Sequence, residues 1–169
     1  RVMRDDDICR VLEVIHKDAR CPSVSFTGGE PTLRPGLVRF VRHAKGLGLR
    51  VNLISNGQRI DARLAGELRD GGLDSAQLSL EGATADRHDA LVGRAGAFER
   101  LWQAVENLRA CGIRVHTNTT LSQRNRDEIE SIVDLVAERG LERLTMNLVI
   151  PCGSARDRTQ AIRYSDAGD

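Results

Sequence analysis

Segments with a strand pattern alternate with amphipathic helix patterns along this chain, and the alternation limits the folds that it can adopt. A helix pattern at residues 5–19 comes first. The predicted strands are 23–27, 50–55, 74–80, 113–121 and 144–150. A helix pattern with apolar residues three and four positions apart follows each of the first four strands. Strands that alternate with helices pair in parallel through right-handed crossovers. The sequence therefore predicts one α/β domain.

Polar residues recur at every second position of the predicted strands, although parallel strands buried on both faces are usually apolar throughout. These positions are Ser25, Thr27, Asn52, Gln77, Ser79, Glu81, His116, Asn118, Thr120, Thr145 and Asn147. The helices need one apolar face of the sheet, so the polar residues should point to the other face, where buried polar groups need partners. We therefore predict an open (βα) barrel with a polar concave lining around a polar ligand, rather than a flat Rossmann or flavodoxin sheet.

Two local patterns lie between the later strands. Residues 83–96 are polar and lack a helix period, so we predict a loop there. Asn125 followed by Glu128 is typical of a capping box, which would open the helix that contains Ile129 and Ile132.

Composition excludes several classes of partner. The 169 residues allow one domain with a sizeable core, and the formal net charge is only +1. Without a strong charge, and with 3% aromatic residues, the chain offers no field or stacking platform for nucleic acid. No apolar run approaches the roughly 20 residues that span a bilayer, and no signal peptide opens the chain. We therefore expect a cytoplasmic protein with no nucleic-acid or membrane partner.

The four cysteines do not form a recognisable framework. Cys9, Cys21, Cys111 and Cys152 are far apart in sequence, and no pair has C-x-x-C spacing. Disulfides are uncommon in a reducing cytosol, so buried or incidental thiols are the simplest interpretation of the first three.

A stiff loop is predicted where the first strand ends, in Thr27-Gly28-Gly29-Glu30-Pro31. Both glycines can adopt a positive φ and let a ligand approach the backbone, and Pro31 biases Glu30 toward an extended conformation. Ligands of α/β barrels bind at the carboxyl ends of the strands, which is where this loop should lie. By itself the pattern also fits a tight turn that carries a surface glutamate.

The order of five short motifs resembles that of radical S-adenosylmethionine (SAM) enzymes over roughly residues 5–155. The motifs are GGEP at 28–31, SNG at 55–57, SLEG at 79–82, TNTTL at 117–121 and VIPCGSA at 149–155. Residues 88–100, HDALVGRAGAFER, also resemble a segment of peptide-modifying and molybdopterin-type members. The resemblance implies an enzyme that reductively cleaves SAM at a [4Fe–4S] cluster to a 5′-deoxyadenosyl radical, which abstracts hydrogen from a substrate. It makes a peptide one candidate substrate, and flavodoxin or ferredoxin the reductant.

The resemblance also implies SAM-binding residues, all of them at or near the carboxyl ends of predicted strands. They are Gly28, Gly29 and Glu30 for the methionyl amine, with Pro31 in the same loop; Ser55 and Asn56 for the methionyl carboxylate or the substrate; Ser79 and Glu81 for the ribose; Asn118 for the ribose or carboxylate; and Val149, Ile150 and Pro151 for the adenine. Such carboxylate, amide and hydroxyl groups suit a zwitterion and a diol. Glu81 stands where Asp is common in this motif. No catalytic residue is assigned, and His88, Asp89 and Arg94 are either loop residues or functional ones.

One part of the family pattern is missing. Members ligate the cluster with three thiolates in C-x-x-x-C-x-x-C after the first barrel strand, and this spacing does not occur here. We therefore predict no metal ligand in this chain, Cys152 included, and no SAM cleavage by the chain as given. We expect a fragment cut at both ends, with residues 1–155 as a core domain that lacks its first strand and 156–169 as an aperiodic tail leading to a further region. Residues 23–26 would then form an unpaired edge that favours association.

Two other interpretations remain open. The chain could be a cluster-free, degenerate SAM-binding or interaction domain of the same fold. A barrel enzyme that uses Gly28-Gly29 as a phosphate cradle fits less well, because the loop has no basic partner and no helix N-cap.

Overall fold

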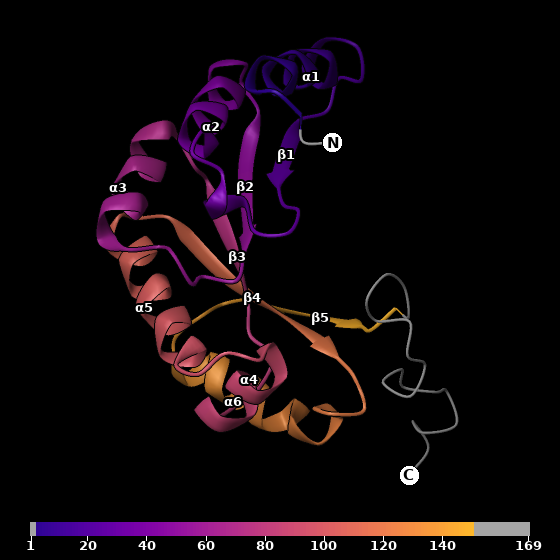
Figure 1. Cartoon of the computed structure of the whole chain (residues 1–169), viewed down its shortest axis with the longest axis vertical. Helices are drawn as coiled ribbons and strands as arrows, with labels where there is room; N and C mark the ends of the chain where they lie inside the picture. The colour runs from indigo at the N-terminus through magenta and orange to yellow at the C-terminus, as the bar shows by residue number, and fades with distance from the viewer. Residues whose placement is uncertain (1–2, 151–169) are drawn as a thin grey trace. The chain divides into compact units, whose positions relative to one another are not determined.

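Helices and strands alternate along the chain as predicted (Figure 1). The computed structural model describes residues 3–150. The elements are α1 (Asp5–Lys17), β1 (Ser23–Phe26), η1 (Pro31–Leu33), α2 (Leu37–Gly46), β2 (Arg50–Ser55), α3 (Ala62–Gly71), β3 (Ser75–Ser79), α4 (Ala85–Val92), α5 (Ala97–Ala110), β4 (Arg114–Leu121), η2 (Arg126–Glu128), α6 (Ile129–Glu138) and β5 (Leu144–Leu148), where η marks a short 3-10 helix. The predictions for Pro151, Cys152 and the tail at 156–169 lie outside the described residues.

The strands form a five-stranded sheet in the order β1-β2-β3-β4-β5. β1 pairs in parallel with β2, β2 with β3, and β4 with β5. Strand order that follows chain order is the order of a (βα) barrel, whereas a Rossmann or flavodoxin sheet reverses its order at a switch point. The predicted α/β class with parallel strands is confirmed. β1 is an edge strand of the sheet within residues 3–150.

The chain divides into two compact units. The first holds residues up to Leu78 together with Arg100–Val115, and the second holds Ser79–Glu99 together with the residues from His116 on. β3, α5 and β4 contribute residues to both units.

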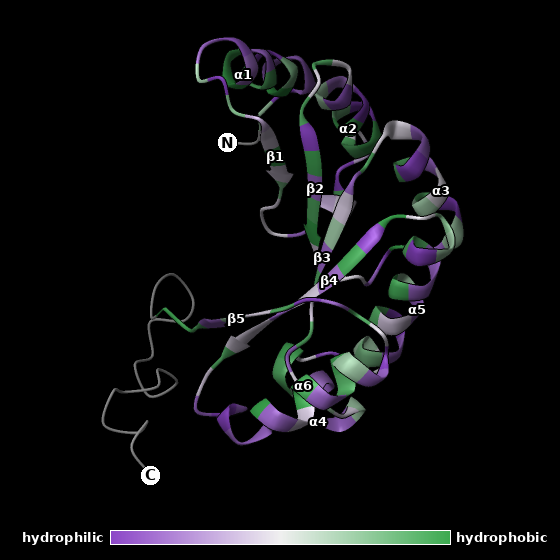
Figure 2. Ribbon diagram, turned by 180° about the vertical axis from the view of Figure 1, so that it is seen from behind, coloured by the Kyte–Doolittle hydropathy of each residue, from purple (hydrophilic) through white to green (hydrophobic). Residues whose placement is uncertain are grey.

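The first unit has the alternating strand faces that the sequence predicts. Val51 and Leu53 of β2 are buried, and so are Val41 of α2 and Leu68 of α3, whereas Asn52 is half-buried. In Figure 2, hydrophobic and hydrophilic residues alternate along the helices, as expected for helices with one buried and one exposed face. The apolar face of β2 therefore packs against helices.

The polar face of the first unit is held by hydrogen bonds between strands. Asn52 Nδ2 donates to Ser25 Oγ at 3.4 Å, and Ser75 Oγ donates to Asn52 Oδ1 at 2.9 Å. These side chains connect β1, β2 and β3 on the face away from the apolar core, so the predicted polar lining is present on these strands.

The second unit buries polar residues of β4: the side chains of Asn118 and Thr119 have hydrogen-bond partners, whereas the buried Thr117 Oγ1 has none within residues 3–150. Thr119 Oγ1 donates to the Leu80 carbonyl at 2.6 Å, and Asn147 Nδ2 donates to Asn118 Oδ1, also at 2.6 Å. Ile132 and Val136 of α6 supply buried apolar side chains. Hydrogen bonding thus offsets the cost of burying the side chains of Thr119 and Asn118.

Two local predictions were wrong. Residues 83–96 contain helix α4, which begins after the N-cap Thr84 and ends at Gly93 with φ +69°. The only buried residue of α4 is His88. The helix therefore has no stripe of buried apolar residues that a sequence pattern could reveal. Asn125 makes no capping hydrogen bond, and the chain passes through η2 before α6 begins at Ile129.

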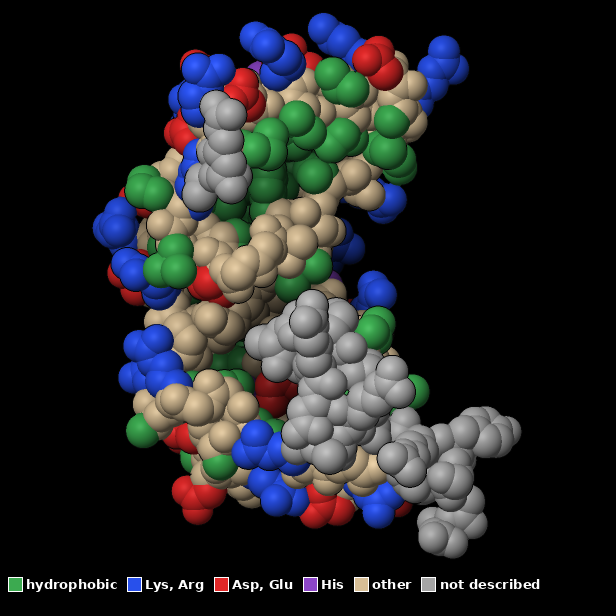
Figure 3. Space-filling view, turned by 45° about the vertical axis from the view of Figure 1, so that its right-hand side comes forward, with side chains coloured by type: hydrophobic (Ala, Val, Ile, Leu, Met, Phe, Trp, Pro, Cys, Tyr) green, Lys and Arg blue, Asp and Glu red, His purple; other side chains and the backbone are tan. Residues whose placement is uncertain are grey.

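Charges of both signs are interspersed on the face shown in Figure 3, in keeping with a formal net charge of +1. Within residues 3–150, no helix combines the length and the apolar composition that crossing a membrane requires.

Candidate functional site

The carboxylate of Glu30 is the centre of a hydrogen-bond network in the first unit. Its Oε1 accepts from Thr32 N at 3.0 Å, from Thr32 Oγ1 at 2.6 Å and from Ser55 Oγ at 2.8 Å. Its Oε2 accepts from Asn56 N at 2.9 Å. One side chain therefore caps η1 and connects the loop after β1 to the carboxyl end of β2.

The backbone of this loop is open on the glycine side. Gly28 has φ +135°, a conformation that favours glycine, whereas Gly29 does not have a positive φ. A Cβ atom built on either glycine would meet no atom within 4 Å among the described residues. Glu30 has φ −151° and ψ 109°, the extended conformation expected before Pro31. The loop thus presents bare backbone beside a fixed carboxylate.

Ser55 and Asn56 lie within hydrogen-bond distance of Glu30 in the first unit. All three residues were predicted to bind SAM, and a shared site requires them to be close together. Ser55 is 3% exposed, and its Oγ accepts from Gly57 N at 3.1 Å while donating to Glu30. The Asn56 side chain is exposed and accepts from Gln58 N at 3.0 Å. In this arrangement Ser55 orients the Glu30 carboxylate.

Glu81 is the corresponding centre of the second unit. Its carboxylate Oε2 accepts from Thr120 N at 2.9 Å, and its Oε1 has no hydrogen bond within residues 3–150. Burial raises the pKa of the Glu81 carboxyl above its usual range, and the bond from Thr120 partly opposes that shift. A buried carboxylate with one free oxygen can accept a hydrogen bond from a hydroxyl such as a ribose OH.

His88 and Asp89 have structural contacts that the sequence left undecided. Glu81 N donates to His88 Nδ1 at 3.1 Å, and burial lowers the pKa of His88, so the neutral ring accepts at Nδ1. Asp89 accepts from Phe98 N at 2.9 Å and from Gly96 N, and these bonds lower the pKa of Asp89. His88 thus links α4 to the Glu81 segment, and Asp89 links α4 to the start of α5.

Asn125, which is 1% exposed, has a role that its sequence context does not indicate. Its Oδ1 accepts from Ser122 N at 2.8 Å, and its Nδ2 donates to the carbonyls of Glu81 at 2.9 Å and Thr120 at 3.1 Å. Asn125 and His88 are bonded to the backbone of Glu81, and Thr120 N is bonded to the Glu81 carboxylate. Both the backbone and the side chain of Glu81 are therefore held in place. Its spacing to Glu128 suggested a cap, and no local signal indicated this role.

The other predicted site residues lie on or after strands of the second unit. Ser79 ends β3, and Asn118 on β4 is 9% exposed and accepts from Asn147. Val149 N donates to the Leu121 carbonyl at 2.8 Å, and Ile150 is 73% exposed.

Glu81→Gln should change how stability depends on pH. An acid with a raised pKa keeps its proton to a higher pH in the folded state than in the unfolded chain, so the free energy of unfolding falls as pH rises from about 4.3 to the raised value. Glutamine cannot ionise, so the variant should gain stability over the wild type as pH rises through this window. Urea unfolding at about pH 4 and about pH 8 measures the gain. An equal difference at both pH values would contradict it, and Glu106→Gln, on the exposed side of α5, is the control.

The three thiols within residues 3–150 do not gather into a ligand set. Cys9, Cys21 and Cys111 are free and half-buried. Within residues 3–150, no group of three or more His, Cys, Asp or Glu side chains is arranged to hold a metal ion. The described residues therefore do not fit a three-thiolate cluster.

A family model described as the radical SAM superfamily matches residues 1–136. The chain is 34% identical over 134 residues to an AdoMet-dependent heme synthase of Oleidesulfovibrio alaskensis, covering 79% of this chain and 34% of that protein. It is 37% identical over 124 residues to a PqqA peptide cyclase of Ruegeria pomeroyi, covering 73% and 33%. The chain thus spans about a third of the length of these curated relatives.

Solved structures with a similar fold include two that were determined with bound molecules. Streptococcus suis SuiB bound to its precursor peptide SuiA aligns with a TM-score of 0.77 at 20% identity, over 92% of this chain and 35% of that one. Native anSMEcpe with bound AdoMet aligns with a TM-score of 0.72 at 20% identity, over 88% and 43%. These likenesses concern the fold, and they confirm the predicted partial (βα) barrel class.

Proposed function

The chain belongs to the radical SAM superfamily, and on this premise we propose that it is part of an enzyme that reductively cleaves SAM to a 5′-deoxyadenosyl radical, which abstracts hydrogen from a substrate. The observation that carries the proposal is the loop after β1, in which Gly28 and Gly29 leave the backbone open beside the fixed Glu30 carboxylate. An open backbone next to an anion suits an ammonium group such as the methionyl amine.

Each unit contributes its own residues to this proposal. In the first unit, Gly28, Gly29 and Glu30 would hold the methionyl amine. In the second, Glu81 with Ser79 would accept from the ribose hydroxyls, which is supported by Glu81 Oε1, an atom without a hydrogen bond within residues 3–150. Asn118, Val149 and Ile150 complete the proposed set around the ribose and the adenine.

The [4Fe–4S] cluster would supply the electron for SAM cleavage, and we place its ligands outside this chain. The four cysteines lack C-x-x-x-C-x-x-C spacing, and the aligned part of this chain covers only about a third of the length of each matched relative. Cys152 follows the last strand with no other thiol near it in sequence. We propose a cytoplasmic enzyme, with flavodoxin or ferredoxin as reductant and a peptide as one class of substrate, as in the SuiB complex.

The test is reductive SAM cleavage by the full-length protein after iron–sulfur reconstitution. We expect 5′-deoxyadenosine to form with dithionite as reductant, and the cluster's spectroscopic signal to persist in Cys152→Ala. SAM binding without iron incorporation or 5′-deoxyadenosine would contradict the proposed function and favour the cluster-free domain.

A further inference from the structure

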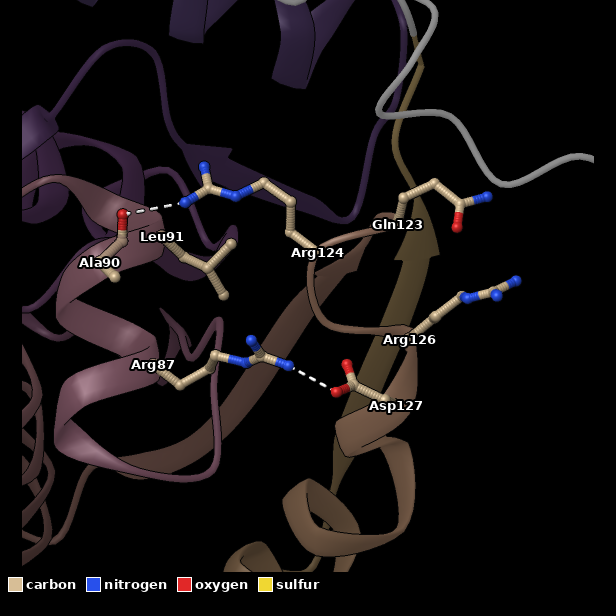
Figure 4. Close-up of a pocket in the computed structure, with 7 residues that line it drawn as sticks. All are labelled: Arg87, Ala90, Leu91, Gln123, Arg124, Arg126 and Asp127. Carbon is tan, nitrogen blue, oxygen red and sulfur yellow. Dashed lines mark hydrogen bonds and ion pairs between the residues drawn. The ribbon is translucent and has the colours of Figure 1, made fainter.

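A pocket of about 290 Å³ lies in the second unit, between α4 and the turn that follows β4 (Figure 4). Three of its charged lining residues are arginines, Arg87, Arg124 and Arg126, and one is Asp127. Ala90 and Leu91 of α4 form an apolar wall. The turn directly follows the carboxyl end of β4, the end at which ligands bind in barrels of this class.

The arginines differ in how far their charge is offset. Arg87 is paired with Asp127 at 2.5 Å and lies 3.5 Å from Glu128 Oε2. Arg124 donates to the neutral carbonyl of Ala90 at 3.3 Å, and within residues 3–150 neither Arg124 nor Arg126 has a carboxylate partner. Within residues 3–150, two arginines that line this pocket therefore have no carboxylate partner, in a chain whose formal net charge is only +1.

The turn that carries these two arginines is fixed by the residue between them. Asn125 is 1% exposed and bonds Ser122 N and the carbonyls of Glu81 and Thr120, so it cannot rotate freely. The opposite wall, α4, is attached to the same segment through the bond between Glu81 N and His88. Both walls are thus held in place, which lowers the entropic cost of binding a ligand between them.

We propose that this pocket binds a carboxylate group of the substrate, an inference that rests on the proposed function. A guanidinium presents a planar pair of donors that matches a carboxylate. The apolar wall of Ala90 and Leu91 suits a carboxylate carried on a short hydrocarbon arm. An acidic side chain of a peptide and a propionate of a tetrapyrrole both have this chemistry.

Titration of the full-length protein with three probes tests the proposal. The probes are a hexaglutamate peptide, the tetrapropionate coproporphyrin III, and an uncharged hexaglutamine peptide. We expect one or both carboxylate probes to bind more tightly than hexaglutamine, and the double variant Arg124→Gln/Arg126→Gln to lose about tenfold in affinity for the bound probe. Binding of hexaglutamate alone identifies an acidic peptide as the ligand class, and binding of coproporphyrin III alone identifies a propionate.

A matched control removes the same charge elsewhere. Arg42→Gln/Arg143→Gln changes two exposed arginines that do not line the pocket and should leave probe affinity unchanged. The proposal is overturned if neither carboxylate probe binds better than hexaglutamine, or if the pocket and control variants lose affinity equally. SAM cleavage by the wild type is measured separately and tests the proposed function. If the protein cleaves SAM but fails the titration, the pocket proposal alone is rejected. If it passes the titration but does not cleave SAM, only the proposed function is rejected.

Discussion

Glu30→Ala is expected to weaken the affinity of the full-length protein for SAM about ten- to a hundredfold, since a hydrogen bond to a charged group contributes roughly 1.5–3 kcal/mol. The substitution removes the acceptor of four hydrogen bonds that join the glycine loop to Thr32 and to the end of β2. Loop geometry and negative charge are lost together. Calorimetric titration with SAM measures the effect.

Ser55→Ala separates the two contributions. Ser55 is 3% exposed and donates to Glu30 Oε1, so its loss disturbs the carboxylate while leaving its charge in place. We expect a smaller loss of SAM affinity, about three- to tenfold. Glu106→Ala, on an exposed face of α5, is the control for removing a glutamate. Unchanged SAM affinity in Glu30→Ala would remove Glu30 from the proposed site.

Asn125→Ala is expected to lower the free energy of unfolding by about 2–4 kcal/mol. The alanine leaves Ser122 N without its acceptor and the carbonyls of Glu81 and Thr120 without a buried donor. Unsatisfied buried groups of this kind cost more than the bonds themselves contribute. Urea unfolding monitored by circular dichroism measures the loss.

Asn107→Ala provides the comparison for Asn125. The Asn107 side chain donates to the Ile60 carbonyl at 2.9 Å and accepts from the exposed Gln103 Nε2 at 3.3 Å, so its loss should cost only about 1 kcal/mol. A destabilisation of Asn125→Ala no larger than that of Asn107→Ala would show that the turn after β4 does not depend on the Asn125 network.

The order of the strands and the position of the glycine loop could be predicted from the sequence. Apolar periods of two and about 3.6 residues depend on neighbours close in the chain, so β2 was predicted with its observed bounds, and the alternation of Val51, Asn52 and Leu53 predicted its two faces. The preference of Glu30 for an extended conformation followed from the proline after it, and that too is a local effect.

Tertiary structure alone decided which polar groups meet. Glu30 and Ser55 are 25 residues apart, and Asn125 and the Glu81 carbonyl are 44 apart. Their hydrogen bonds depend on how strands and loops pack, which no local spacing encodes. The same reason explains α4: its one buried residue, His88, is fixed by the Glu81 backbone rather than by an apolar stripe, so the helix had no period to detect. A buried polar atom takes the partner that the fold brings within about 3 Å of it, and that partner is set by the packing of distant segments.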